Sequence, residues 1–259
     1  AAAMVRDGDD RLATMTLFAA QTDFTEAGEL MLFIDEAQVS FLEDIMAEQG
    51  CLDTKQMAGT FQLLRSNDLI WSAMVQNYLM GERRPMFDLM AWNADATRMP
   101  ARMHSEYLRQ LFLDNDLADE RYRVDGRPVS LHDIRIPIFA VSTLSDHVAP
   151  WRSVYKIHSQ TNADVTFVLS NGGHNAGIVS PPGNTRRRHQ IATHDDLAAY
   201  LDPDAWQARA THHEGSWWPC WLGWLSDHSG EPVKPPGLGA ARKGYRRLGE
   251  APGTYVLMP

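Results

Sequence analysis

Three short apolar runs along the chain have the length and composition of buried β-strands. They are Leu12–Ala20, Ile136–Ser142 and Val165–Ser170, and the last two are rich in β-branched residues. Trp151–Gln160, between the second and third runs, has a helical pattern, so this region predicts a βαβ unit with parallel strands. Ala1–Val5 looks like the last turn of a helix. We therefore predict an α/β fold, which the chain enters in the middle of an α/β unit.

The stretch from about residue 36 to residue 116 has a different pattern. Apolar residues recur there at three- and four-residue spacing in four segments: Ala37–Gln49, Gln56–Leu64, Leu69–Leu79 and Ala101–Asp114. No apolar run typical of a strand interrupts them. The pattern therefore predicts a helical region between the first strand and the βαβ unit.

The part of the chain after Ser180 has a looser pattern, with Pro–Pro pairs at 181–182 and 235–236. Five of the eight tryptophans gather between Trp206 and Trp224. Tryptophans at helical spacing pack a terminal helix onto a core more often than they cage a ligand, so we predict that packing role.

The composition excludes several classes of protein. The 259 residues are 44% hydrophobic and 22% charged, as in a globular protein with one large domain or two small ones. The net charge of −9 argues against nucleic-acid binding, which needs a basic surface. Two distant cysteines, Cys51 and Cys220, indicate neither a disulfide scaffold nor a zinc ribbon and favour a cytoplasmic location. No apolar run approaches the ~18 residues of a membrane span.

Two chemically active side chains follow the strands of the βαβ unit. Asp146 comes shortly after the first strand, and His174 follows Gly172 and Gly173 after the second. Parallel strands end at the same edge of a sheet, so we expect these side chains to lie near each other. A carboxylate beside an imidazole fixes its tautomer and stabilises the imidazolium. A catalytic pair is one interpretation, and a chance arrangement of two strand ends is the alternative.

The pair lacks a nucleophile in this sequence. In the hydrolase order of nucleophile, acid and histidine, a G-x-S/C-x-G turn should precede Asp146, and none does. Cys51 has no glycine two residues later, and Cys220 follows His174 in the chain. No metal site is expected, because the spacing of the histidines matches no familiar ligand set: His189, His194, His212 and His213.

Several motifs carry a family resemblance. They are Gln56–Trp71, Asn77–Gly81, Trp92–Pro100, Asp146–Pro150, Ser170–Gly177, Gly215–Pro219 and Ala251–Val256. Through these motifs, of which the one that begins at Trp92 is the most specific, nearly the whole chain resembles the polyhydroxyalkanoate synthases, and the class I type in particular.

The resemblance implies an α/β-hydrolase fold with an inserted helical cap. The hydrolase core would comprise residues 1–35 and 122–259, and the cap residues 36–121. It implies a homodimer that forms through the cap and a cytoplasmic protein associated with polyester granules.

The resemblance also implies a reaction. A cysteine takes a 3-hydroxyacyl group from 3-hydroxyacyl-CoA, and coenzyme A is the leaving group, so no resident cofactor is expected. His174 would activate the cysteine, and Asp146 would support acyl transfer to the 3-hydroxyl of the next unit. His147, beside Asp146, would lie just behind the reacting groups.

The sequence departs from the family where the nucleophile should be. The cysteine and the oxyanion-hole donors are expected upstream of Ala1, so we predict a C-terminal portion of a synthase that is inactive alone, with the strand at Leu12–Ala20 at an unpaired edge. Two alternatives stay open. A serine in the upstream turn would favour a hydrolase or thioesterase. An inactive granule-binding or dimerising module would not depend on His174.

Overall fold

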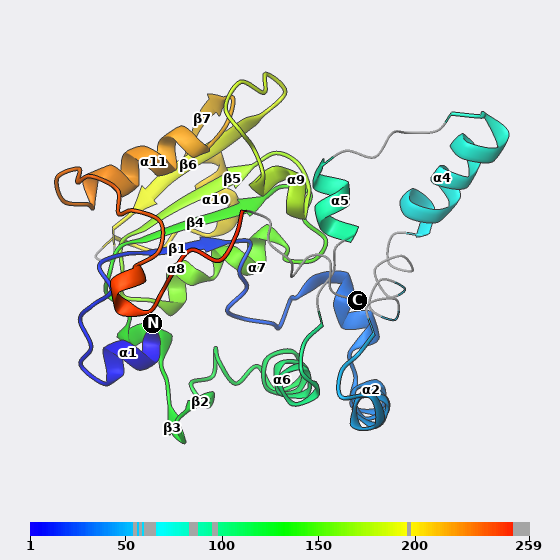
Figure 1. Cartoon of the computed structure of the whole chain (residues 1–259). Helices are drawn as coiled ribbons and strands as arrows, with labels where there is room; N and C mark the ends of the chain where they lie inside the picture. Colours follow the sequence, from blue (N-terminus) through cyan, green and yellow to red (C-terminus); the bar gives the residue numbers. More distant parts are fainter. Residues whose placement is uncertain are drawn as a thin grey trace.

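The central element of the protein is a five-stranded sheet (Figure 1). The computed structural model describes residues 1–53, 56, 59, 66–82, 88–94, 98–195 and 198–250. The strands of the sheet are, in spatial order, β1 (Met15–Phe18), β4 (Ile138–Thr143), β5 (Val165–Ser170), β6 (Arg188–His194) and β7 (Thr211–Glu214). β1, β4 and β5 are parallel, whereas β6 and β7 each run antiparallel to the preceding neighbour. A separate ribbon pairs β2 (Arg123–Val124) with β3 (Arg127–Pro128).

The α/β prediction is confirmed at the level of strands and their direction. All three predicted strands form, and the parallel βαβ unit is the pair β4 and β5. Every residue of these two strands is buried, as their apolar, β-branched composition indicates. The predicted helix between them is divided into α7 (Trp151–Tyr155) and α8 (Ile157–Gln160).

Helices cover both faces of the sheet. One face packs against a core that includes residues of α1 (Ala2–Arg6), α7, α8 and α10 (Pro203–Arg209). The other face packs against α11 (Trp218–Asp227), with Ile178 of α9 (His174–Ile178) beside it. Successive residues of β4 point to opposite faces, so Ile138 and Ala140 belong to the first core. Phe139 and Val141 belong to the second.

The region predicted to be helical from residue 36 onward forms a series of helices in the structure. A short turn, η1 (Gly28–Phe33), precedes it. Its elements are α2 (Glu36–Gln49), η2 (Asn67–Trp71), α4 (Ser72–Met74), η3 (Val75–Leu79), α5 (Asp88–Ala94), α6 (Ala101–Glu106) and η4 (Tyr107–Leu113). The predicted helix Gln56–Leu64 falls largely outside the described residues. Asp35 caps α2 by accepting a hydrogen bond from the Gln38 N–H at 2.8 Å, and Gly50, with φ +77°, ends it. α2 and α6 lie together, whereas α4 stands apart from the rest in this view (Figure 1).

The prediction of a loose C-terminal part is wrong between Arg188 and Asp227. β6, α10, β7 and α11 all form there, and the short turn η6 (Ala241–Lys243) follows α11. Another short turn, η5 (Leu131–Asp133), precedes β4. β6 reads Arg-His-Gln-Ile-Ala-Thr-His, so it lacks the apolar alternation of a predictable strand. Its conformation comes from six antiparallel residue pairs with β5 instead.

The strand β1 has one neighbour, β4, among the described residues. Its Phe18 side chain remains 43% exposed, although it contacts the rings of Trp217 and Trp221. The expectation that this strand lies at an edge of the sheet therefore agrees with the structure. Among the described helices, none is long and apolar enough to cross a membrane.

Candidate active site

Two loops at the end of the βαβ unit bring Asp146 and His174 together. β4 and β5 end in register, with Thr143 opposite Ser170. The loops that follow are then joined by backbone hydrogen bonds, from Leu144 N–H to the Ser170 carbonyl at 2.9 Å and from Ser145 N–H to the Gly172 carbonyl at 3.0 Å. The predicted proximity of the two side chains is therefore confirmed, and it follows from strand register.

The imidazole of His174 is hydrogen-bonded to the carboxylate of Asp146. Nδ1 of His174 lies 2.9 Å from Oδ2 and 3.2 Å from Oδ1 of Asp146. An Nδ1–H that donates to the carboxylate leaves Nε2 with a free lone pair, which is the state of a general base. The Asp146 side chain is fully buried, whereas that of His174 is 39% exposed. The imidazole is therefore accessible from solvent, whereas the carboxylate is shielded from water.

Further hydrogen bonds hold the Asp146 carboxylate. Oδ1 accepts from the backbone N–H groups of Val148 at 2.9 Å and Ala149 at 2.8 Å, and Oδ2 accepts from the Thr143 hydroxyl at 3.3 Å. Burial by itself raises the pKa of Asp146, but the hydrogen bonds from His174, Ala149 and Val148 outweigh it and hold the pKa below its ordinary value. The carboxylate therefore stays ionised at neutral pH.

Two glycines allow close packing around the pair. A Cβ on Gly177 of α9 would collide with Thr143, the residue whose hydroxyl reaches Asp146. A Cβ on Gly28, where φ is +80°, would lie 2.8 Å from Pro150 Cγ and 3.2 Å from the His147 carbonyl oxygen. Sequence reasoning missed these contacts and Thr143. The glycine-rich Ser170–Gly177 motif was the available signal for Gly177, and Gly28 had none.

The tryptophan-rich helix fixes the segment that carries His174. Trp217 donates from Nε1 to the Gly177 carbonyl at 3.1 Å, and Trp218 donates to the Ile178 carbonyl at 3.0 Å. The predicted packing role is confirmed for α11 and its flanking residue. Trp206 is different, since it is buried in the core on the opposite face of the sheet.

Neither cysteine makes a hydrogen bond to His174 in the described structure. Cys51 is half-buried and its backbone pairs with that of Pro100. Cys220 Sγ lies 3.5 Å from Nε2 of His189, a contact that sequence reasoning did not anticipate. His147 is exposed beside Asp146. Among the described residues, the imidazole of His174 thus has a carboxylate as its hydrogen-bond partner and no thiol.

No metal ligand set forms among the described side chains. No group of three or more His, Cys, Asp or Glu residues there could hold a metal ion. Two of the four histidines considered as metal ligands stack on each other instead. The rings of His189 and His213 lie 5.3 Å apart between centroids.

The chain is similar to known proteins over nearly its whole length. No protein-family model matches it. The poly(3-hydroxyalkanoate) polymerase of Methylorubrum extorquens is 42% identical over 253 residues, which are 97% of this chain and 41% of that polymerase. The poly(3-hydroxyalkanoate) polymerase subunit PhaC of Rhizobium meliloti is 42% identical over 96% of the chain, and the one of Cupriavidus necator 37% identical over 98%.

These similarities confirm the resemblance to the polyhydroxyalkanoate synthases that the motifs predicted. The chain spans about two fifths of the length of the curated relatives, between 40% and 44% for these three.

Proposed function

We propose that this chain, which is homologous to poly(3-hydroxyalkanoate) polymerases over nearly its whole length, carries the general base and the supporting carboxylate of such a polymerase. In this proposal the chain is the C-terminal portion of a class I-like enzyme. His174 is the base and Asp146 its partner. The thiol nucleophile comes from a part of the polymerase that precedes Ala1.

The proposed reaction is polymerisation of 3-hydroxyacyl-CoA by acyl transfer. His174 Nε2 accepts the proton of the thiol, and the thiolate attacks the thioester carbonyl of the substrate, which releases coenzyme A. The 3-hydroxyl of the next unit then attacks the enzyme-bound acyl group and extends the polyester. Asp146 holds the Nδ1–H of His174 and stabilises the imidazolium that forms in each proton transfer. Coenzyme A is the leaving group, and the proposal includes no cofactor or metal.

The contact between His174 Nδ1 and Asp146 is the observation that carries this proposal. A purely structural ion pair would not need a half-exposed imidazole whose second nitrogen is free. The buried, hydrogen-bonded carboxylate keeps its charge, as the partner of a catalytic histidine must.

We further propose that the sheet belongs to an α/β-hydrolase fold with residues 36–121 as an inserted cap, between core segments 1–35 and 122–259. The parallel strands β1, β4 and β5 and the position of Asp146 and His174 after β4 and β5 support it. A third hydrophobic core, apart from the two on the faces of the sheet, joins α2 to η4 and to Phe24 and Ala27 of segment 1–35. It supports a helical insertion that docks on that segment.

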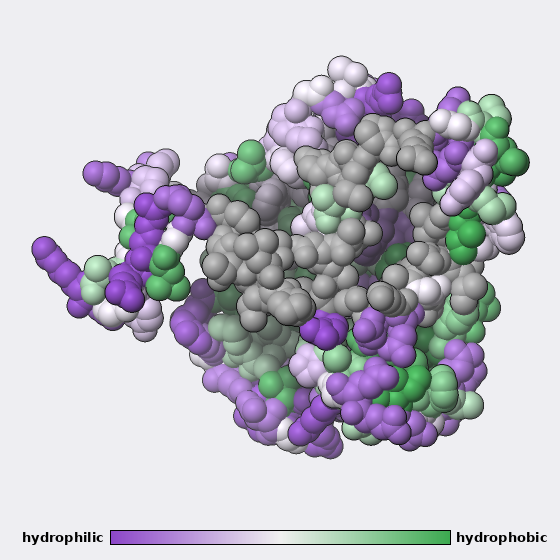
Figure 2. Space-filling view, turned by 45° about the vertical axis from the view of Figure 1, so that its right-hand side comes forward, coloured by the Kyte–Doolittle hydropathy of each residue, from purple (hydrophilic) through white to green (hydrophobic). Residues whose placement is uncertain are grey.

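We also propose a homodimer formed through the cap, in a cytoplasmic protein associated with polyester granules. Exposed apolar side chains on the helical segment 67–80 support an interaction there: Ile70, Trp71, Met74, Val75, Tyr78, Leu79 and Met80. On the face drawn in Figure 2, hydrophobic residues reach the surface in several separate places among hydrophilic ones. Light scattering over a concentration series tests the dimer, and Tyr78→Ser should weaken it.

A chimera tests the proposed function in a complete polymerase. In it, this chain replaces the matching part of the Methylorubrum extorquens polymerase. The chimera should release coenzyme A from 3-hydroxybutyryl-CoA, and His174→Ala should abolish the release. His132→Ala is the matched control, since His132 is exposed on η5 and makes no contact with Asp146. The isolated chain should release none.

Two results would contradict the proposal. One is coenzyme A release by a folded His174→Ala chimera at the rate of the control. The other is release of free 3-hydroxy acid without polymer, which would favour the thioesterase alternative. Granule binding that survives His174→Ala, in a chimera without activity, would favour the inactive-module alternative.

A further inference from the structure

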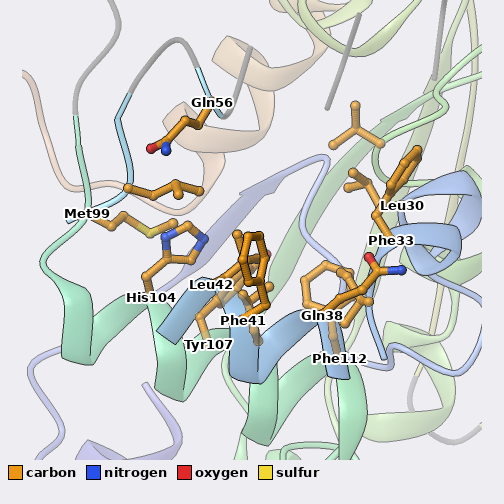
Figure 3. Close-up of a pocket in the computed structure, with 14 residues that line it drawn as sticks. Leu30, Phe33, Gln38, Phe41, Leu42, Gln56, Met99, His104, Tyr107 and Phe112 are labelled. Carbon is orange, nitrogen blue, oxygen red and sulfur yellow. The ribbon is translucent and has the colours of Figure 1, made fainter. Parts of the chain in front are cut away.

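A large apolar cavity lies between α2 and the helical segment formed by α6 and η4 (Figure 3). Its volume is about 650 Å³, within the roughly 300–1,000 Å³ of small-molecule sites. The walls include Leu42 and Phe41 of α2, and Leu108 and Phe112 of η4. Figure 3 shows Leu30 and Phe33 at one end of the cavity, and His104, Met99 and Gln56 at the other.

The cavity adjoins the loop that holds the candidate carboxylate. Val148 forms part of its wall. The backbone N–H of Val148 donates to Oδ1 of Asp146 at 2.9 Å. A molecule in the cavity would therefore touch the residue that binds Asp146, so the cavity and the catalytic pair are neighbouring parts of one region.

The lining that the structure describes carries no full charge. None of the described lining residues is Lys, Arg, Asp or Glu. His104 is 4% exposed, and burial lowers its pKa, so its imidazole is neutral at neutral pH. Burial also raises the pKa of Tyr107, which keeps its hydroxyl protonated. A charged ligand would lose its hydration here without gaining a counter-charge.

The polar groups of the lining are few and neutral. They are Gln38, Gln56, His104 and Tyr107. An amide N–H or a phenol can donate a hydrogen bond to an ester carbonyl. The lining therefore suits an elongated, uncharged molecule with scattered acceptors. It does not suit coenzyme A, whose phosphates are anionic, or a fatty-acid anion.

We propose that this cavity binds the ester-linked units of the product that lie behind the reacting one. The inference rests on the proposed function, because only a growing polyester supplies an uncharged ester chain beside Asp146 and His174. Binding there holds the chain near the catalytic pair between additions and involves no covalent step.

A binding experiment on this chain tests the inference without any acyl transfer. The probe is a trimer of 3-hydroxybutyrate with an acetylated hydroxyl end and a methyl-ester end, and calorimetry measures its affinity. The trimer should bind at least about tenfold more tightly than decanoate, an anion of similar length, because of the missing counter-charge. Tighter binding of decanoate would overturn the inference.

Matched variants on α2 locate the binding. Leu42→Trp fills the cavity and should weaken trimer binding by about tenfold or more. Ala47→Trp introduces the same side chain at an exposed position of α2 outside the cavity and should leave the affinity unchanged. Phe41→Ala removes a 65% exposed side chain, which folding can tolerate, and should weaken binding as well. Equal affinities in all variants with unchanged circular dichroism would overturn the inference.

The two proposals fail in different ways. If the chimera shows His174-dependent release of coenzyme A but the trimer does not bind, the cavity inference fails alone. If the trimer binds as described but the chimera releases nothing, the proposed function fails, together with the assignment of the cavity to a growing chain.

Discussion

Two histidine side chains beside the same sheet differ in their hydrogen-bond partners and in their exposure to solvent. His174 lies just beyond β5, its side chain is 39% exposed, and its Nδ1 faces the Asp146 carboxylate. His189 lies inside β6, is 4% exposed, and its Nε2 meets the Cys220 thiol at 3.5 Å. A histidine beside a thiol looks more like a catalytic pair than a histidine beside a carboxylate, yet the surroundings indicate the reverse.

The two histidines differ in the charge of the partner group and in whether solvent reaches the ring. Nδ1–H of His189 donates to the Gly215 carbonyl at 3.2 Å, so its Nε2 accepts the hydrogen bond of the Cys220 thiol. Burial lowers the pKa of His189 and raises the pKa of Cys220, which keeps both neutral. Asp146 is buried too, but its hydrogen bonds preserve its charge. The comparison teaches that a strand end exposes an imidazole to a reactant, whereas a strand interior makes it part of the packing.

The largest expected effect is on the rate of coenzyme A release, when His174 and His189 are each substituted. In the chimera, His174→Ala should lower coenzyme A release by roughly 10⁶-fold, the scale of a lost triad histidine. His189→Gln should leave the rate per folded molecule unchanged and lower the thermal midpoint instead. Initial rates and melting curves of both variants measure this, and similar rate losses in the two would remove the distinction.

Asp146→Asn should lower the rate by roughly 10⁴-fold, because an amide no longer fixes the tautomer of His174. Asn keeps the shape of the Asp146 side chain, so the substitution removes its charge and little else. Asp227→Asn, at the end of α11, is the control. A variant that keeps more than about a tenth of the activity would argue that Asp146 only packs against the imidazole.

A third imidazole, that of His158 in α8, should make the fold sensitive to acid. Burial lowers the pKa of His158 to about 4, well below the ~6.5 of an unfolded histidine. The unfolded state therefore binds the proton first. Below about pH 6.5 the free energy of unfolding should fall by up to roughly 1.4 kcal/mol per pH unit until about pH 4, and above pH 6.5 this loss is absent.

Urea unfolding between pH 4.5 and 7.5 measures that slope. His158→Phe, which can keep the ring contacts with Tyr155 and Phe167, should flatten it. An unchanged slope in His158→Phe would contradict the assignment.

The smallest expected effect concerns the packing around the Asp146–His174 contact. Gly177→Ala should destabilise the fold by roughly 1–3 kcal/mol, because the new Cβ meets Thr143. Gly223→Ala is a matched helical control, since its Cβ would meet nothing within 4 Å. Denaturant midpoints compare the two. If both variants are equally stable, the contact between α9 and Thr143 does not constrain the site.

The sequence predicted the contact between Asp146 and His174 better than the surroundings of that contact. β4 and β5 are continuous apolar runs, and the rule that parallel strands end together placed Asp146 near His174 without any coordinates. β6 and β7 were missed, since polar residues fill them and their pairing with β5 and with each other is a tertiary effect. The contact between Cys220 and His189 depends on that missed strand.

Contacts across long stretches of chain were likewise unpredictable. Gly28 reaches Pro150, and Trp217 reaches the Gly177 carbonyl, only after the sheet and helices have assembled. The cavity has the same origin, because α2 and η4 face each other only in the folded chain.

The tautomer of His174 tests the central claim most directly. Nitrogen-15 spectra of the labelled chain at pH 8.5 report which imidazole nitrogen carries the proton. We predict a protonated Nδ1 and a proton-free Nε2, with this preference lost in Asp146→Asn. A proton on Nε2 in the parent chain would contradict the assignment of His174 as a base held by Asp146.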